Sequence, residues 1–208
     1  MKLALELTRG IAQLGLDIPA PAQHGMLQYL ELLQKWNKVY NLTAIRQPEQ
    51  MVTHHLLDSL AVLPHLWPGH WLDVGCGAGL PGLVLAMARP GWEFTLLDSN
   101  SKKTSFVQQA IIDLKLSNAR VCCARAEEWE PNEKFDGIIS RAFAEAADFV
   151  AATRHLLADG GRWVAMKGHL EHDVKLLPAD IRIEQTISLQ VPGLTGARHL
   201  AVLSIHNE

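Results

Sequence analysis

Three alternating glycines follow an acidic residue within residues 71–82, and together they could form a ligand-binding turn. Gly75, Gly77 and Gly79 are spaced two apart, and Asp73 lies two residues before the first of them. Glycine has no Cβ, so its backbone can approach a ligand closely and adopt positive φ without strain. The flanking apolar residues predict a strand before the turn and a helix after it, whose first N–H groups point toward a ligand. The stretch therefore predicts a site for a nucleotide-like ligand.

Two cofactors compete for this loop, because residues 77–82 also match the G-x-G-x-x-G pattern of dinucleotide-binding proteins. The carboxylate of Asp73 helps to decide between the two cofactors. A pyrophosphate is an anion that a neighbouring acid repels, whereas S-adenosylmethionine carries an ammonium and a sulfonium and no phosphate. The pattern D-x-G-x-G-x-G therefore favours S-adenosylmethionine over NAD, with Asp73 beside the methionine portion.

Asp98 ends the next apolar run, residues 93–98. It follows Gly79 by roughly 20 residues, the separation expected of the acid that binds a ribose in a Rossmann-type unit. A carboxylate can accept hydrogen bonds from both ribose hydroxyls. The alternative is that Asp98 caps the helix that follows it. Because NAD and S-adenosylmethionine both contain a ribose, Asp98 supports a nucleoside ligand without separating the two.

The composition is that of a globular protein without a membrane segment. The chain has 208 residues, of which 48% are apolar and 20% charged, and its longest apolar run is too short to span a bilayer. Residues 1–10 are a poor candidate for a signal peptide, because the charged residues Glu6 and Arg9 interrupt their short apolar stretch. We therefore expect a cytoplasmic location. The net charge of −3 argues against tight non-specific binding to nucleic acid. The three cysteines lack metal-ligand spacing, and we expect no metal.

The elements that must position these residues fall into two parts. Residues 1–65 carry apolar residues at helical spacing and predict a helical extension packed on the rest, its third helix running over 48–63. Residues 66–208 alternate between strands and helices, which predicts a Rossmann-like α/β domain with a mostly parallel, seven-stranded sheet and helices on both faces. Two final β-rich runs, 181–190 and 198–206, predict a hairpin. Both parts should form one compact unit.

Five predicted strands carry the candidate site residues on one rim of this sheet. The strands are expected at 71–75, 93–98, 119–124, 135–140 and 162–167, with a short helix afterwards at 169–177. Ligands of α/β proteins bind beyond the carboxyl ends of parallel strands. The residues that follow these ends should therefore converge: Gly75–Leu80, Asp98, Ala126, Glu127, Ser140, Arg141, Lys167 and Gly168.

Several longer motifs resemble those of one enzyme family over essentially the whole chain. The most specific are W-N-x-x-x-N-L-T within residues 35–43 and H-x-x-D-S within residues 55–60. Further matching segments are 73–82, 97–99, 126–127, 135–143, 167–168 and 198–200. On these residues the chain resembles the bacterial small-subunit ribosomal RNA methyltransferase G family, also called glucose-inhibited division protein B.

This resemblance implies a class I S-adenosylmethionine-dependent methyltransferase that methylates N7 of one guanine in 16S rRNA of the small ribosomal subunit. The matching motifs imply contacts to S-adenosylmethionine from Gly75, Leu80, Ala126, Glu127 and Arg141, with Asp98 at the ribose; Gly77 and Gly79 belong to the same loop. We expect a monomer whose partner is 16S rRNA or the small subunit, with no membrane partner.

Methylation of guanine N7 needs no general base, because N7 has an in-plane lone pair and no proton to remove. Positioning and electrostatics should therefore dominate. Residues 140–143 lack the Asp/Asn-Pro-Pro-aromatic sequence typical of exocyclic amine methylation. Arg141 is the candidate catalytic residue, since its guanidinium could bind the methionine carboxylate or an RNA phosphate. The alternative interpretation is that Arg141 lies on the surface and only forms a weak salt bridge. For Glu127, the alternative to a contact with the cofactor is that its carboxylate is a solvent-exposed charge in a loop.

Scattered basic residues are candidates for RNA contact, and three other functions stay open. The basic candidates are Lys35, Lys38, Arg46, Lys102, Lys103, Lys167 and Arg198. Trp36 could stack on a base or belong to the helix core. The alternative functions are methylation of a small molecule or protein, a non-catalytic RNA-binding module, and an NAD-dependent oxidoreductase.

Overall fold

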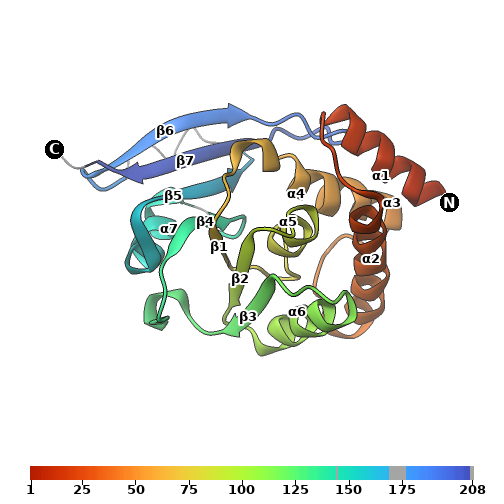
Figure 1. Cartoon of the computed structure of the whole chain (residues 1–208), viewed down its shortest axis with the longest axis horizontal. Coiled ribbons are helices and arrows are strands. Elements are labelled where there is room, and N and C mark those ends of the chain that lie inside the picture. Colours follow the sequence, from red (N-terminus) through yellow and green to blue (C-terminus); the bar gives the residue numbers. More distant parts are fainter. Residues whose placement is uncertain (144, 169–176, 207–208) are drawn as a thin grey trace.

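The described strands form one seven-stranded sheet (Figure 1). The structure, a computed structural model, describes residues 1–143, 145–168 and 177–206. The strand order is β3-β2-β1-β4-β5-β7-β6. The strands are β1 His70–Val74, β2 Glu93–Asp98, β3 Ala119–Cys123, β4 Phe135–Ser140, β5 Leu157–Lys167, β6 Ile181–Ser188 and β7 His199–Ile205.

The sheet is mixed. The pairings among β1 to β5 are parallel, whereas β7 is antiparallel to both β5 and β6. The predicted pairing of the last two β-rich runs is confirmed, and β7 also inserts between β5 and β6. The expectation of a mostly parallel sheet therefore holds only for the part that carries the carboxyl-end rim.

Helices pack on both faces of the sheet. They are α1 Lys2–Gln13, α2 Ala20–Tyr40, α3 Pro48–Met51, α4 Asp58–Leu60, α5 Gly82–Ala88, α6 Ser101–Asp113 and α7 Ala146–Thr153. A π-helix, η1, spans Val52–Leu57, and the short 3-10 helices are η2 Leu63–His65, η3 Ala126–Glu128 and η4 Arg154–Leu156. The predicted third helix, 48–63, is interrupted by the π-helix η1. The helix predicted at 169–177 lies almost entirely outside the described residues.

Alternation along β1 explains the two layers of the core. Trp71 joins a hydrophobic cluster with α2, α5 and α6, whereas Leu72 joins a second cluster with α7. Figure 1 shows α7 and the N-terminal helices on opposite sides of the sheet. Burial of these apolar faces is the dominant favourable contribution to folding. Because α1 and α2 share the first cluster, they pack directly on the sheet domain; the domain boundary at residue 65 stays a prediction.

None of the helices within the described residues is long and apolar enough to cross a membrane.

Candidate active site

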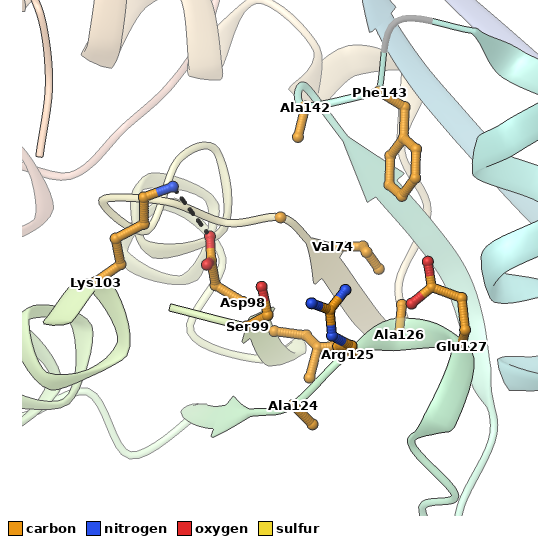
Figure 2. Close-up of a pocket in the computed structure, with 12 residues that line it drawn as sticks. Val74, Asp98, Ser99, Lys103, Ala124, Arg125, Ala126, Glu127, Ala142 and Phe143 are labelled. Carbon is orange, nitrogen blue, oxygen red and sulfur yellow. Dashed lines mark ion pairs between the residues drawn. The ribbon is translucent and has the colours of Figure 1, made fainter. Parts of the chain in front are cut away.

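A cavity of about 310 Å³ lies at the carboxyl ends of β1 and β2. It is lined by four of the predicted site residues, Gly75, Asp98, Ala126 and Glu127. Figure 2 shows the carboxylates of Asp98 and Glu127 on opposite sides of this opening. The predicted convergence on one rim is confirmed for these residues. We call this space the first cavity.

Several further lining residues of the first cavity were not assigned a role from the sequence, and three of them have polar or aromatic side chains. These three are Ser99, Arg125 and Phe143. Arg125 precedes the Ala126 and Glu127 pair. The aromatic ring of Phe143 lies on the same side of the cavity as Glu127 (Figure 2). Ser99 and Phe143 lie within the matching segments 97–99 and 135–143, which was the available signal, whereas Arg125 was indicated only by its place next to Ala126.

A smaller second cavity, of about 130 Å³, adjoins the first and shares Gly75 and Ala142 with it. Three more predicted site residues, Gly77, Leu80 and Arg141, line this second cavity. The rim therefore carries two neighbouring spaces that meet at Gly75.

Gly79 lines neither of these two cavities. Its φ is +83°, and a Cβ built there would lie 2.5 Å from Cδ1 of Leu83. Glycine at this position lets the loop turn tightly onto the start of α5. Direct contact of Gly79 with a cofactor stays a prediction, and packing explains the residue in this structure.

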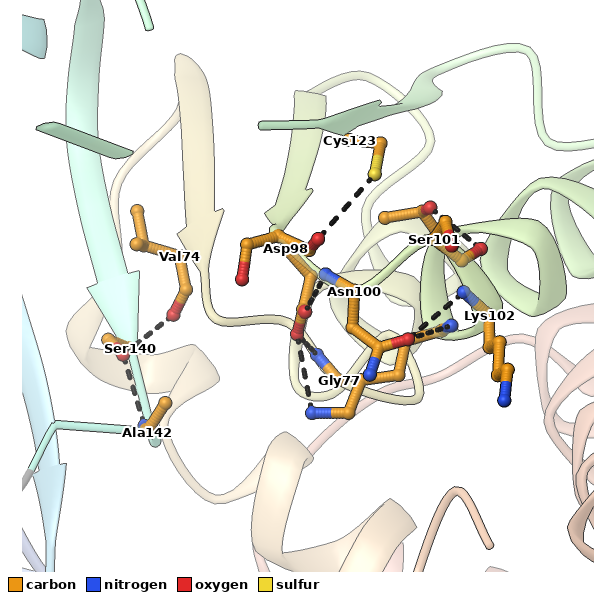
Figure 3. Close-up of polar contacts among 12 residues, drawn as sticks. Val74, Gly77, Asp98, Asn100, Ser101, Lys102, Cys123, Ser140 and Ala142 are labelled. Carbon is orange, nitrogen blue, oxygen red and sulfur yellow. Dashed lines mark hydrogen bonds and ion pairs between the residues drawn. The ribbon is translucent and has the colours of Figure 1, made fainter. Parts of the chain in front are cut away.

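Gly75 lies close against the segment after β4. Its φ is +69°, and an added Cβ would lie 2.6 Å from the Cβ of Ala142. Ser140 holds that segment in place, since its hydroxyl donates to Val74 O at 2.7 Å and accepts from Ala142 N at 3.1 Å (Figure 3). Only glycine leaves this junction between the two cavities open.

Asp98 ties the glycine loop to the end of β2. Its Oδ2 accepts a hydrogen bond from Gly77 N at 2.9 Å and lies 3.7 Å from Lys103 Nζ, and its Oδ1 accepts from Asn100 N at 2.9 Å (Figure 3). A carboxylate oxygen has two lone pairs, so these bonds leave acceptor capacity toward the cavity.

Asn100, rather than Asp98, caps helix α6. The Asn100 side chain accepts from the backbone N–H groups of Lys102 and Lys103 at 3.0 and 3.4 Å. This satisfies two of the donors that a helix start leaves without partners. The alternative interpretation of Asp98 as the helix cap is therefore wrong.

Asp73 is buried beneath the loop instead of lining a cavity. Its Oδ2 accepts from Gly82 N at 2.8 Å, and its Oδ1 has no hydrogen-bond partner among the described residues. Burial raises the pKa of Asp73 to about 7, against the opposing effects of the Gly82 hydrogen bond and the Arg141 charge. A buried carboxyl with an unpaired oxygen and a pKa near neutrality can ionise readily beside a cationic group.

Arg141 is neither fully exposed nor in a simple surface salt bridge. Its Nη1 lies 3.3 Å from Oδ2 of Asp58 and donates to His54 O at the same distance. The Asp58 side chain is only 2% exposed, so this ion pair is largely shielded from solvent. Asp58 belongs to the H-x-x-D-S motif, which was the available signal, but no role was predicted for it.

His55 lines the second cavity as a neutral side chain. Its Nε2 lies 3.0 Å from Oγ1 of Thr43, and its Nδ1 has no partner among the described residues. Burial, reinforced by the positive charge of Arg141, lowers the pKa of His55 to about 4. His55 therefore adds no positive charge to the site at neutral pH.

The basic candidates for RNA contact do not form one patch in this structure. Lys167 and Arg198 line a third cavity, of about 360 Å³, which shares His55 and Arg141 with the second. Lys103 lies instead at the first cavity. Other candidates are exposed or bound to loop residues: Lys35, Lys38, Lys102 and Arg46.

Trp36 belongs to the core side of its helix. Its ring lies edge-on to Phe106, with centroids 5.7 Å apart, and Phe106 is fully buried. The interpretation of Trp36 as a packing residue is confirmed.

Comparison with known proteins gives close relatives of this chain. A relative from Laribacter hongkongensis, named Ribosomal RNA small subunit methyltransferase G, is 49% identical over 99% of this chain and 100% of its own. A relative of the same name from Methylobacillus flagellatus is 54% identical over 95% of this chain and 96% of its own.

Solved structures of more distant proteins share the fold. TrmN from Thermus thermophilus matches with a TM-score of 0.56 at 19% identity, over 71% of this chain and 48% of that one. The N-methyltransferase NodS from Bradyrhizobium japonicum, in complex with S-adenosyl-L-homocysteine, matches with a TM-score of 0.55 at 15% identity, over 86% and 98%. The family model described as rRNA small subunit methyltransferase G matches residues 22–201, and the chain belongs to that family.

Proposed function

We propose that this protein transfers the methyl group of S-adenosylmethionine to N7 of a guanine in 16S rRNA of the small ribosomal subunit. The single observation that carries this proposal is the row of three neighbouring cavities along the strand rim, of which the first two share Gly75 and the last two share Arg141 as a lining residue. A bisubstrate transfer needs two neighbouring spaces that meet at the reacting atoms. Relatives that match nearly the full chain are named Ribosomal RNA small subunit methyltransferase G, which supports a methyl transfer to ribosomal RNA.

Two features of the loop fit S-adenosylmethionine. The Gly75 cradle is a space that a Cβ would fill, and Asp73 beneath it offers an orphaned oxygen. An acid favours the ammonium and sulfonium of this cofactor and would repel a pyrophosphate. The cofactor supplies a methyl group already activated by its sulfonium.

The proposed cofactor contacts divide between the two cavities. In the first cavity, Asp98 would accept from the ribose hydroxyls, and Ala126 and Glu127 would meet the adenine edge. In the second, Gly75, Gly77 and Leu80 would follow the methionine portion, and Arg141 would bind its carboxylate through a charge-assisted hydrogen bond.

The chain's own residues contribute by positioning the reactants, and His55 adds no charge beside them. Guanine N7 carries no proton, so no residue has to remove one. His55, with its pKa lowered to about 4, is uncharged beside the transfer site. A neutral imidazole does not oppose the arrival of a cationic methyl donor, and preorganised dipoles around the reactants require little rearrangement.

The decisive experiment measures incorporation of labelled methyl from S-adenosylmethionine into naked 16S rRNA, assembled small subunits and bulk protein, followed by mapping of the modified base. We expect label in the ribosomal RNA and a modified guanine N7. Label only in protein or in small molecules would refute the proposal, as would tight NADH binding without S-adenosylhomocysteine binding. We further expect a cytoplasmic monomer, which sedimentation and cell fractionation would check.

A further inference from the structure

The third cavity is a pocket of ligand size next to the proposed transfer site. It encloses about 360 Å³, within the range of roughly 300–1,000 Å³ typical of small-molecule sites. It opens beyond the end of β5 and reaches the second cavity through His55 and Arg141. Ile45 and Met166 give it an apolar wall. A ligand with a flat apolar part and a reactive edge toward the second cavity would fit this arrangement.

One buried carboxylate organises the polar side of this cavity. Asp58 is 1% exposed, and each of its oxygens holds a different arginine. Oδ2 lies 3.3 Å from Arg141 Nη1, and Oδ1 accepts from Arg198 Nε at 3.0 Å. Asp58, Arg141 and Arg198 come from three distant segments: α4, the turn after β4 and the residue before β7. The ion pairs therefore fix the two guanidinium groups side by side.

The π-helix η1 contributes a further hydrogen-bond acceptor to this cluster. The wider turn over Val52–Leu57 ends directly before Asp58, and the carbonyl of His54 within it accepts the second bond from Arg141. Single π-helical turns occur frequently at functional sites because they redirect side chains and carbonyls from a regular helix. Here the π-turn presents one carboxylate and one carbonyl to the rim.

Both arginines keep donors that Asp58 does not use. Their side chains are 32% and 30% exposed. Arg198 donates from Nε to Asp58 and from Nη1 to the carbonyl of Ala197. Within the described residues its Nη2 has no hydrogen-bond partner. A guanidinium has five donors in a rigid fork that matches a phosphate. A fixed, partly open arginine is therefore suited to an anion.

Charge movement during the reaction indicates which part of the acceptor the arginine meets. Methyl transfer moves one positive charge from the sulfonium sulphur to the guanine ring, with the N7 lone pair forming the new bond and the sulphur keeping the old bonding pair. A guanidinium against the ring would oppose this change, whereas a guanidinium against a phosphate would not. Arg198 should therefore contact the phosphate backbone, and the base should lie on the apolar wall.

We propose that the third cavity receives the acceptor nucleotide, that Arg198 binds a phosphate flanking it, and that Asp58 is a positioning residue that couples Arg198 to Arg141. This inference rests on the proposed function, because it assumes an RNA acceptor. It assigns the two arginines to different partners: Arg141 to the cofactor and Arg198 to the RNA.

The test compares Arg198→Gln with Arg182→Gln as a matched control. Arg182 is a half-exposed arginine on the edge strand β6, ion-paired with Glu184 outside the cavity row. For Arg198→Gln we expect the KM for small subunits or 16S rRNA to rise about tenfold, as for loss of one charge-assisted hydrogen bond. The slope of log affinity for RNA against log salt should fall by about one. The Kd for S-adenosylhomocysteine should stay within twofold of the wild type.

Two more variants keep the proposal falsifiable if one of them folds poorly. Asp58→Asn should weaken both RNA and S-adenosylhomocysteine binding, because both arginines lose their anchor. Arg198→Lys should retain the wild-type salt slope while binding RNA more weakly, since it keeps the charge and loses the fork. An Arg198→Gln variant with wild-type RNA affinity, or one that loses only S-adenosylhomocysteine, would overturn the assignment. These binding readouts are independent of methylation, so an inactive wild type would refute the proposed function separately.

Discussion

The hydroxyl of Tyr29 donates a hydrogen bond of 2.7 Å to the backbone carbonyl of Ala78, in the middle of the glycine loop. Tyr29 is fully buried in α2, and its ring lies 6.1 Å from that of Phe106 in α6. The N-terminal helices therefore support the loop directly, through a polar contact inside the hydrophobic core. This makes the first helices part of the architecture of the proposed cofactor site.

Tyr29→Phe should reduce both stability and cofactor affinity. The variant keeps the ring and leaves the Ala78 carbonyl buried without its partner, which costs about 1–3 kcal/mol of unfolding free energy. The loop should then be less ordered, so we expect the Kd for S-adenosylhomocysteine to rise a few-fold. Urea unfolding and calorimetry measure the two effects. Tyr40→Phe, at the exposed end of the same helix, is the control and should change neither.

Gly75→Ala should abolish cofactor binding through a steric clash with Ala142. The new Cβ would lie 2.6 Å from the Ala142 Cβ, and the residue would also have to hold a φ of +69°. Gly160→Ala separates these effects, since Gly160 has a φ of +77° with nothing within 4 Å of its Cβ. It should lose about 1 kcal/mol of stability from backbone strain alone.

A second substitution checks the origin of the Gly75 effect. Adding Ala142→Gly to Gly75→Ala removes the clash and keeps the strained φ, so affinity for S-adenosylhomocysteine should recover in part. If the double variant binds no better than Gly75→Ala, strain rather than the close approach explains the loss.

Asp73 should make cofactor binding depend on pH near neutrality. Burial raises the pKa of this carboxyl to about 7, so a large fraction is protonated in the free protein at pH 6. An ammonium nearby favours the ionised form, which means that binding releases a proton and strengthens as the pH rises toward 8. Calorimetry of S-adenosylhomocysteine in buffers of different ionisation enthalpy measures the released proton. In Asp73→Asn, which can still accept from Gly82, that proton release should disappear.

Local sequence patterns were sufficient to predict the first cavity. Gly75, Asp98, Ala126 and Glu127 each lie at the end of an apolar run or within three residues beyond it, and parallel strands bring their carboxyl ends to one rim. The strand order at the β6 edge of the sheet was harder to predict, because it depends on which strands β7 pairs with. Alternation along a strand indicates its faces and gives little information about its neighbours.

The cluster at Asp58 could not be predicted from local pattern. Asp58 pairs with Arg141, which lies 83 positions further along the chain, and with Arg198, which lies 140 positions further. Charged residues occur throughout the sequence, and only the packing of η1 against the rim selects these three. The π-turn itself was missed because apolar spacing over 48–63 fits a continuous helix, and one widened turn changes that spacing very little.

His55 should make the protein less stable in mild acid. Burial, followed by the Arg141 charge, lowers the pKa of this imidazole from 6.5 to about 4, so the folded state resists protonation that the unfolded chain accepts. Between those two values the unfolded state binds more protons, and the unfolding free energy falls as the pH drops. The full shift corresponds to at most about 3 kcal/mol. Urea unfolding from pH 7.5 to 4.5 should show this loss.

His55→Gln is the matched variant, because its amide can still bond to Thr43 and does not titrate. It should be less stable than the wild type at pH 7.5 and lose less stability in acid, so the two curves converge as the pH falls. Parallel curves would mean that His55 is protonated equally easily in the folded and unfolded states. In that case the imidazole would be charged at the second cavity in mild acid, and its electrostatic neutrality toward a cationic methyl donor would be lost there.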